Sequence, residues 1–98
     1  MSDQAQASSA QAAVMRVVVV TPERALFEGP ASAVVAPAFD GLVGILPRHA
    51  PFLTLLGTGG LTIRSGDGER RFSVSGGVLQ VVDNVVRVVA AEAKPIEP

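Results

Sequence analysis

The chain has 98 residues, of which 48% are apolar, a formal net charge of −1 at pH 7 and no cysteine. This length allows one small domain, and the lack of cysteine excludes disulfides and thiolate metal sites, which is compatible with a reducing compartment. The 8 basic residues are scattered, with only Arg70 and Arg71 adjacent, and this spacing argues against nucleic-acid binding.

The N-terminal segment, residues 1–14, is rich in Ala, Gln and Ser. It has neither the basic start nor the continuous apolar centre of a secretory signal. No apolar run in the chain reaches the ~18 residues that a membrane-spanning helix needs. We therefore expect a flexible leader at 1–14 and no direct insertion into a membrane. The chain is expected to be cytoplasmic, or held at a membrane assembly by a partner.

From Met15 to Ala91 the pattern is typical of strands, because valine dominates, Gly and Pro recur every few residues, and no helical period appears. The predicted strands are Met15–Val20, Ala25–Glu28, Ala31–Ala36, Val43–Leu46, Gly60–Ser65, Arg70–Ser75, Gly77–Val82 and Val85–Ala90. Short strands at this spacing predict an all-β fold, a single two-sheet antiparallel β-sandwich of about eight to ten strands. We place this domain at 15–93 and an irregular tail at 94–98.

Two hairpins follow from turn sequences. Asp67-Gly68 favours a two-residue type I′ turn. A turn centred there pairs four residues on each side: Ser65 with Arg70, Arg64 with Arg71, Ile63 with Phe72, and Leu61 with Val74. Its apolar face is expected to point to the core. Arg64 opposite Arg71 is mildly unfavourable, and Glu69 on the same face is expected to offset this repulsion.

Asp83-Asn84 predicts the second hairpin and divides its strands into two faces. Leu79, Val81, Val86, Val88 and Ala90 form the expected core face. The opposite face consists of Val78, Gln80, Val82, Val85, Arg87 and Val89. Four β-branched residues are more than a solvated sheet face usually carries, so another segment or a partner protein is expected to cover them.

The segment from Gly44 to Leu56 joins two apolar runs and contains the single histidine, His49. Chemistry at His49 would need an orienting acid, a nucleophile or further metal ligands, and no acidic residue lies near it in sequence. The run from Phe39 to Gly44 resembles a phosphate-binding loop but lacks the Gly-Lys-Ser/Thr ending. The sequence thus predicts no catalytic, cofactor-binding or metal-binding residue. Ser75-Gly76-Gly77 indicates a bulge or a close backbone approach.

An ordered series of short motifs resembles a known family. The series consists of Val19-Val20-Thr21-Pro22-Glu23, Phe27-Glu28-Gly29, Val35-Ala36-Pro37, Asp40-Gly41, Gly44-Ile45-Leu46-Pro47, His49-Ala50-Pro51, Ser75-Gly76-Gly77 with Leu79 and Val81, and Val88-Val89-Ala90. The order resembles the N-terminal β-sandwich of the epsilon subunit of F-type ATP synthase, called delta in mitochondria. The resemblance covers about Met15 to Ala93.

The resemblance implies a ten-stranded sandwich at the foot of the rotor's central stalk, on the cytoplasmic face of the bacterial inner membrane. In that family one side packs on the gamma subunit and one end rests on the ring of c subunits, with one copy per complex. Such a domain couples ion flow through the ring to rotation of gamma and ATP synthesis, and it binds no substrate or cofactor. The resemblance also implies that two loops form the end of the domain that faces the ring. In this chain these loops contain Asp40, Gly41, Leu42, Arg48 and His49. For the gamma contact we expect the face with Val78 and Val89.

The chain departs from the family pattern at three places. Family members usually continue into a C-terminal helical hairpin that can inhibit ATP hydrolysis and in some bacteria binds ATP. The sequence ends at Pro98, so a short form without that hairpin is expected. The family often has glycine where Arg48 stands and an acidic residue where Leu42 stands, and the loss of that acid removes one charge contact expected with the ring. The Ala/Gln-rich leader at 1–14 is an addition to the family pattern.

Two functions of other classes remain open from the residues alone. One is a free-standing β-sandwich that binds a ligand or another protein, which would need a pocket lined by polar groups. The other is a small enzyme that uses His49.

Overall fold

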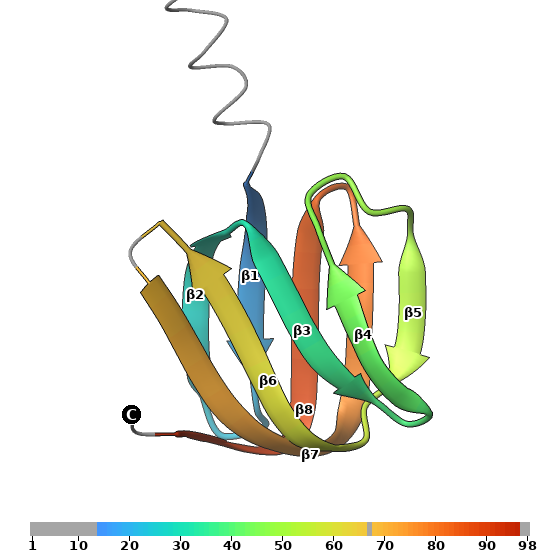
Figure 1. Cartoon of the computed structure of the whole chain (residues 1–98). Coiled ribbons are helices and arrows are strands. Elements are labelled where there is room, and N and C mark those ends of the chain that lie inside the picture. Colours follow the sequence, from blue (N-terminus) through green and yellow to red (C-terminus); the bar gives the residue numbers. More distant parts are fainter. Residues whose placement is uncertain (1–13, 67, 97–98) are drawn as a thin grey trace, which may run out of the picture.

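We describe residues 14–66 and 68–96 of a computed structural model of the chain. This part contains eight strands (Figure 1). They are β1 (Met15–Val20), β2 (Ala25–Ala31), β3 (Ala33–Ala38), β4 (Gly41–Ile45), β5 (Phe52–Leu55), β6 (Thr58–Ser65), β7 (Gly68–Val82) and β8 (Val85–Pro95). The described residues include no helix of the length and hydropathy that a membrane crossing requires.

One continuous sheet folds back on itself to form the two layers of the sandwich. The strand order is β2-β1-β8-β7-β6-β3-β4. β5 pairs with the C-terminal half of β7, along the edge of β7 opposite to β8. We call β2, β1, β8, the C-terminal half of β7, and β5 the β8 layer. The N-terminal half of β7 with β6, β3 and β4 forms the β6 layer. β7 passes from one layer to the other because it is 15 residues long and contains Gly76 and Gly77, whose φ angles are 72° and 113°.

The close approach predicted at the paired glycines is confirmed at Gly77. A Cβ atom on Gly77 would lie 2.1 Å from the carbonyl oxygen of Val89 on β8. Only a residue without a side chain fits this gap, and only glycine adopts a φ of 113° without strain. The two glycines therefore let the longest strand bend where it changes layers.

The predicted all-β class is confirmed, but several details of the prediction are wrong. There is one continuous sheet instead of two, with eight strands at the lower end of the predicted range. The pair β1–β8 is parallel, not antiparallel. The segments 70–75 and 77–82 belong to the single strand β7, and β5 was not predicted. β8 reaches Pro95, so Lys94 and Pro95 are extended rather than irregular. Apart from Val14, the predicted leader lies outside the described residues.

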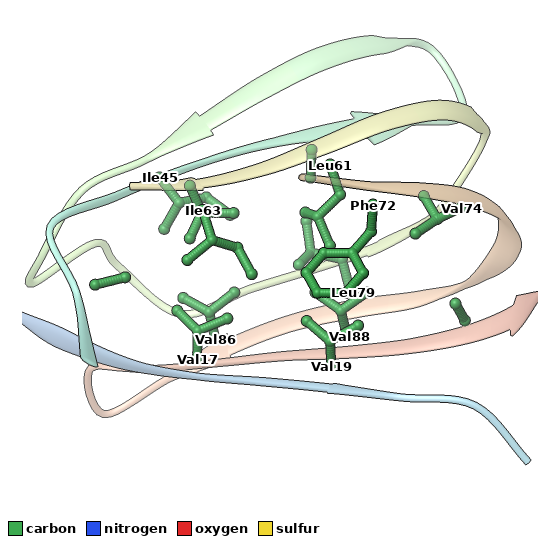
Figure 2. Packing of buried hydrophobic residues seen from close by; sticks show 14 of the residues in the cluster. Val17, Val19, Ile45, Leu61, Ile63, Phe72, Val74, Leu79, Val86 and Val88 are labelled. Carbon is green, nitrogen blue, oxygen red and sulfur yellow. The ribbon is translucent and has the colours of Figure 1, made fainter. Parts of the chain in front are cut away.

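The space between the layers is filled by apolar side chains (Figure 2). Phe72 and Leu79 of β7 are fully enclosed, as are Val17 and Val19 of β1. No polar or charged side chain is buried in the described part of the chain. Burying each such aliphatic or aromatic side chain contributes roughly 1.5–3 kcal/mol to folding. This dry core holds the strands rigidly and fixes which residues point outward.

The register of the β7–β8 hairpin is confirmed. Val82 pairs with Val85, Gln80 with Arg87, and Val78 with Val89. Asp83 and Asn84 have φ angles of 52° and 65°, as a type I′ turn requires at both central positions.

The register predicted for the β6–β7 hairpin is wrong by two residues. Ser65 pairs with Gly68, Arg64 with Glu69, and Leu61 with Phe72. This register leaves two positions, 66 and 67, between the paired residues, and Asp67 lies outside the described residues. Because side chains alternate with a period of two, a shift of two leaves the predicted faces unchanged. It also places Glu69, instead of Arg71, opposite Arg64, which replaces a repulsion by an attraction.

Candidate functional site

The outward side of the β8 layer carries a continuous set of exposed apolar side chains. Directly paired residues on neighbouring strands point to the same side of a sheet. By this rule Leu55, Val78, Val89 and Val20 form one row. The exposed fractions are 68% for Leu53, 59% for Leu55, 36% for Val78, 40% for Val82 and 43% for Val89. We call this side of the β8 layer the outer face.

The six residues proposed from the second hairpin lie together on this outer face. They are Val78, Gln80, Val82, Val85, Arg87 and Val89, all on the outward side of β7 and β8. Cover by another segment is excluded for the described part of the chain, because Val78, Val82 and Val89 remain exposed. The face thus has the grouping that a docking surface needs, and its partner stays a prediction.

Sequence reasoning missed the part of the outer face that β5 supplies. Leu53 pairs with Gln80, and Leu55 pairs with Val78, so both leucines extend the apolar area toward the edge of the layer. The signal was present in the apolar run Phe52–Leu56, which lies between Pro51 and Gly57 and is short enough for a strand. The outward residues of β1, Val18 and Val20, were also not assigned to this face.

Asp40, Gly41 and Leu42 lie at the turn between β3 and β4. Ala38 pairs with Gly41, so the turn consists of Phe39 and Asp40. Phe39 and Leu42 are 66% and 73% exposed. The backbone N–H of Phe39 donates to the carbonyl oxygen of Leu55, at 3.0 Å, and fixes this turn beside the end of β5.

Arg48 and His49 lie at the opposite end of β4, in the connection to β5 (Figure 1). The backbone N–H of Arg48 donates to Oδ1 of Asn84, at 2.8 Å, which places this connection beside the β7–β8 turn. The expectation that the two loops share one end of the domain is therefore wrong. The five residues proposed for the ring contact form two separate groups, and the contact of either group with a ring stays a prediction.

The backbone at Arg48 has a φ of 69°, in the left-handed region that favours glycine. A guanidinium side chain on a strained residue is held outward at the end of the domain, where Arg48 is exposed.

The surroundings of His49 give no support for catalysis. Its Nδ1 lies 2.7 Å from the carbonyl oxygen of Ala50. Because a carbonyl oxygen only accepts, Nδ1 carries the proton in this hydrogen bond. The ring centre lies 5.6 Å from that of Phe52. Within residues 14–66 and 68–96, no group of three or more His, Cys, Asp or Glu side chains could hold a metal ion.

A charged cluster lies on the outside of the β6 layer. Glu69 accepts hydrogen bonds from Arg64 at 3.1 Å and from Arg71 at 3.3 Å. The hydrogen bond from Arg64 lowers the pKa of the Glu69 carboxyl below its usual range, and Arg71 acts in the same direction against the effect of desolvation. This layer is therefore polar where the outer face is apolar.

One hollow of about 340 Å³ lies between β2 and the β6–β7 turn. Arg70 lies at its wall, with its guanidinium carbon 5.4 Å from the ring centre of Phe27 and 5.6 Å from that of Phe72. These cation–π contacts engage Arg70 within the domain. Glu28 and Glu69 also line the hollow, and both carboxylates already accept from arginines, Glu28 from Arg16 and Glu69 from Arg64 and Arg71.

The sequence matches the family model described as "ATP synthase, Delta/Epsilon chain, beta-sandwich domain" over residues 14–96. An "ATP synthase epsilon chain" of Solibacter usitatus is 45% identical over 83 residues, which are 85% of this chain and 62% of that protein. One of Hydrogenovibrio crunogenus is 46% identical over 79 residues, 81% of this chain and 55% of that protein. The chain thus spans about three fifths of the length of these relatives.

Solved structures agree with the fold. A chain in the cryo-EM structure of the Euglena gracilis mitochondrial ATP synthase, OSCP/F1/c-ring, has a TM-score of 0.78 and 26% identity, covering 85% of this chain and 54% of that chain. A chain of the Tetrahymena thermophila mitochondrial ATP synthase central stalk/c-ring structure has a TM-score of 0.68 at 20% identity and supports the fold alone. With a family model that matches residues 14–96, this chain belongs to the family of the ATP synthase delta/epsilon chain β-sandwich domain.

Proposed function

We propose that this chain is a non-catalytic central-stalk subunit of a rotary ATP synthase. In this role it connects the c-ring to the gamma subunit, so that ion-driven rotation of the ring is transmitted to gamma and to ATP synthesis. One copy would be present per complex, as a peripheral component on the cytoplasmic face of the bacterial inner membrane. The family match over residues 14–96 carries the proposal.

The outer face supports a permanent protein partner on one side of the domain. Leu55, Val78 and Val89 expose apolar surface on three neighbouring strands, β5, β7 and β8. Contiguous apolar area of this kind on a small soluble domain marks a protein interface. We assign this face to the gamma subunit, because a torque-transmitting contact has to be broad, rigid and well packed.

For the c-ring contact we propose the end that carries Asp40, Gly41 and Leu42. Phe39 and Leu42 are both highly exposed there, on a tight turn that the hydrogen bond from Phe39 to Leu55 holds in place. Arg48 and His49 lie at the other end, so a ring on the Asp40 side would not reach them. A ring at the Arg48 end is the alternative arrangement.

Copurification tests both contacts. The tagged 98-residue chain, expressed with gamma and the c subunit, is expected to retain gamma and the ring. Asp40→Lys should weaken retention of the ring but leave retention of gamma unchanged, and Arg48→Glu should leave both unchanged. Loss of the ring in Arg48→Glu alone would move the ring contact to the other end. A chain that retains neither protein would contradict the proposed function and favour a free-standing module.

A further inference from the structure

Arg87 lies at the centre of the outer face. The β8 layer has the order β2-β1-β8-β7-β5, so β8 is its middle strand. The residues of β8 that pair with β1 run from Val85 to Val89, and Arg87 is the middle one. Arg87 is exposed, and its neighbours Val86 and Val88 point into the core.

Three of the four nearest side chains around Arg87 on the outer face are aliphatic, and the fourth is Gln80. Val85 and Val89 precede and follow it on the same side of β8, and Val18 pairs with it from β1. Gln80 pairs with it from β7, and Leu53 continues that row on β5. The edges of the layer are two strands away on either side, at about 10 Å. A partner that covers this face would therefore cover Arg87 as well.

The described residues provide no ion pair for Arg87. The acidic residue in its row is Glu28 on β2, which pairs with Val18. Glu28 already accepts a hydrogen bond from Arg16 at 2.8 Å, in a salt bridge of its own. The exposed guanidinium of Arg87 is thus solvated by water in the free domain.

When a partner covers an unpaired guanidinium, the charge loses its water and pays a large desolvation free energy. Contacts between neutral groups do not offset this cost, so a hydrogen-bond acceptor of the partner has to replace the lost water. A carboxylate meets the planar fork of arginine with two parallel hydrogen bonds, and this geometry is the strongest available pairing. We infer that Arg87 is a specificity-determining residue of the outer face, and that the partner presents an Asp or Glu side chain against it within an aliphatic surface.

This inference rests on the proposed function, because gamma is the partner used to test it. The measurement is the dissociation constant between the 98-residue chain and gamma for the wild type, Arg87→Met and Arg87→Glu. Arg87→Met should weaken binding about 30-fold, because it leaves a covered carboxylate unpaired. Arg87→Glu should weaken binding further, and its effect should persist in high salt because a covered pair is weakly screened.

Arg71→Met is the matched control. Arg71 is an exposed arginine on a strand too, but it lies on the outside of the β6 layer. The dissociation constant of Arg71→Met for gamma should lie within about twofold of the wild-type value, because Arg71 lies outside the proposed interface. Circular dichroism and thermal unfolding establish that all three variants remain folded.

The partner residue is identified by replacing the exposed Asp and Glu side chains of gamma with lysine, one at a time, in complexes with Arg87→Glu. One replacement should restore binding to that variant while it weakens binding to the wild type. The inference is overturned if Arg87→Met and Arg87→Glu bind like the wild type, or if no lysine replacement restores binding. In those cases wild-type binding to gamma still supports the proposed function, whereas a wild-type chain that does not bind gamma overturns both.

Discussion

The side-chain Oδ1 of Asn84 accepts a hydrogen bond from the backbone N–H of Arg48, with 2.8 Å between the two atoms. The Nδ2 of the same side chain donates to the carbonyl oxygen of Val14, at 2.9 Å. A single turn residue therefore connects the β7–β8 hairpin to the β4–β5 connection and to the residue before β1.

Two substitutions of Asn84 should distinguish the contribution of its side-chain hydrogen bonds to stability from that of its left-handed backbone conformation. Asn84→Gly keeps a left-handed residue but loses the side chain, and should lower the free energy of unfolding by about 1–2 kcal/mol. Asn84→Ala should lose about 1 kcal/mol more, because Asn84 has a φ of 65°. Urea unfolding of the three proteins measures both steps. Equal stability of the two variants would show that the turn relaxes to another conformation.

Arg48 should show the reverse of the usual order between glycine and alanine. At a φ of 69° a Cβ atom is unfavourable, so Arg48→Gly should be more stable than Arg48→Ala by about 1 kcal/mol. Both variants lose the guanidinium, so the comparison isolates the backbone. Chemical denaturation gives the difference directly, and a more stable Arg48→Ala would contradict the strain assigned to this position.

Gly77→Ala should prevent the bend of β7. The new Cβ atom would lie 2.1 Å from the carbonyl oxygen of Val89, a distance that no packing adjustment of a side chain relieves. The free energy of unfolding should fall by at least about 3 kcal/mol. Gly60→Ala is the control, because nothing lies within 4 Å of its added Cβ, and it should change stability by at most about 0.5 kcal/mol. Similar losses in both variants would mean that strand propensity, not the contact with Val89, limits position 77.

The ion pairs of Glu69 should make the free energy of unfolding depend slightly on pH in the acidic range. The folded-state pKa of Glu69 lies below the usual range of a glutamate carboxyl, because the hydrogen bond from Arg64 and the charge of Arg71 favour the carboxylate. The stabilisation is complete above the ordinary carboxyl pKa, which applies in the unfolded chain, and it is lost as the pH falls through the lowered folded-state pKa. Glu69→Gln should therefore lose less stability than the wild type on acidification over this window. Urea midpoints measured over a pH series provide the test, and parallel curves for the two proteins would show that Glu69 contributes nothing.

The sequence predicted the β7–β8 hairpin in full register because Asp83-Asn84 defines its turn and the strands alternate clearly. It misplaced the β6–β7 register because Gly66 and Gly68 flank Asp67, so two turns of equal length were available. The pairing of Glu69 with Arg64 distinguishes them, and this is a contact between strands that turn preferences do not contain.

The candidate site was predicted only in part for a similar reason. The outward residues of β7 and β8 follow from alternation within one hairpin. Leu53 and Val18 join them through pairings between distant segments, which local patterns cannot supply. The two loops proposed for the ring contact were placed together from a resemblance, whereas β4 lies between them and separates them.

The central claim is that the outer face binds gamma, and a charge-neutral pair of substitutions tests it most directly. Val78 pairs directly with Val89, so Val78→Glu with Val89→Lys adds an attractive pair that the strands tolerate while making the face polar. Thr58→Glu with Ser75→Lys, at paired positions of β6 and β7, is the matched control. We predict that the 98-residue chain binds gamma, that the first double variant binds at least about 100-fold more weakly, and that the control binds normally. Equal binding by both double variants and the wild type would contradict the claim.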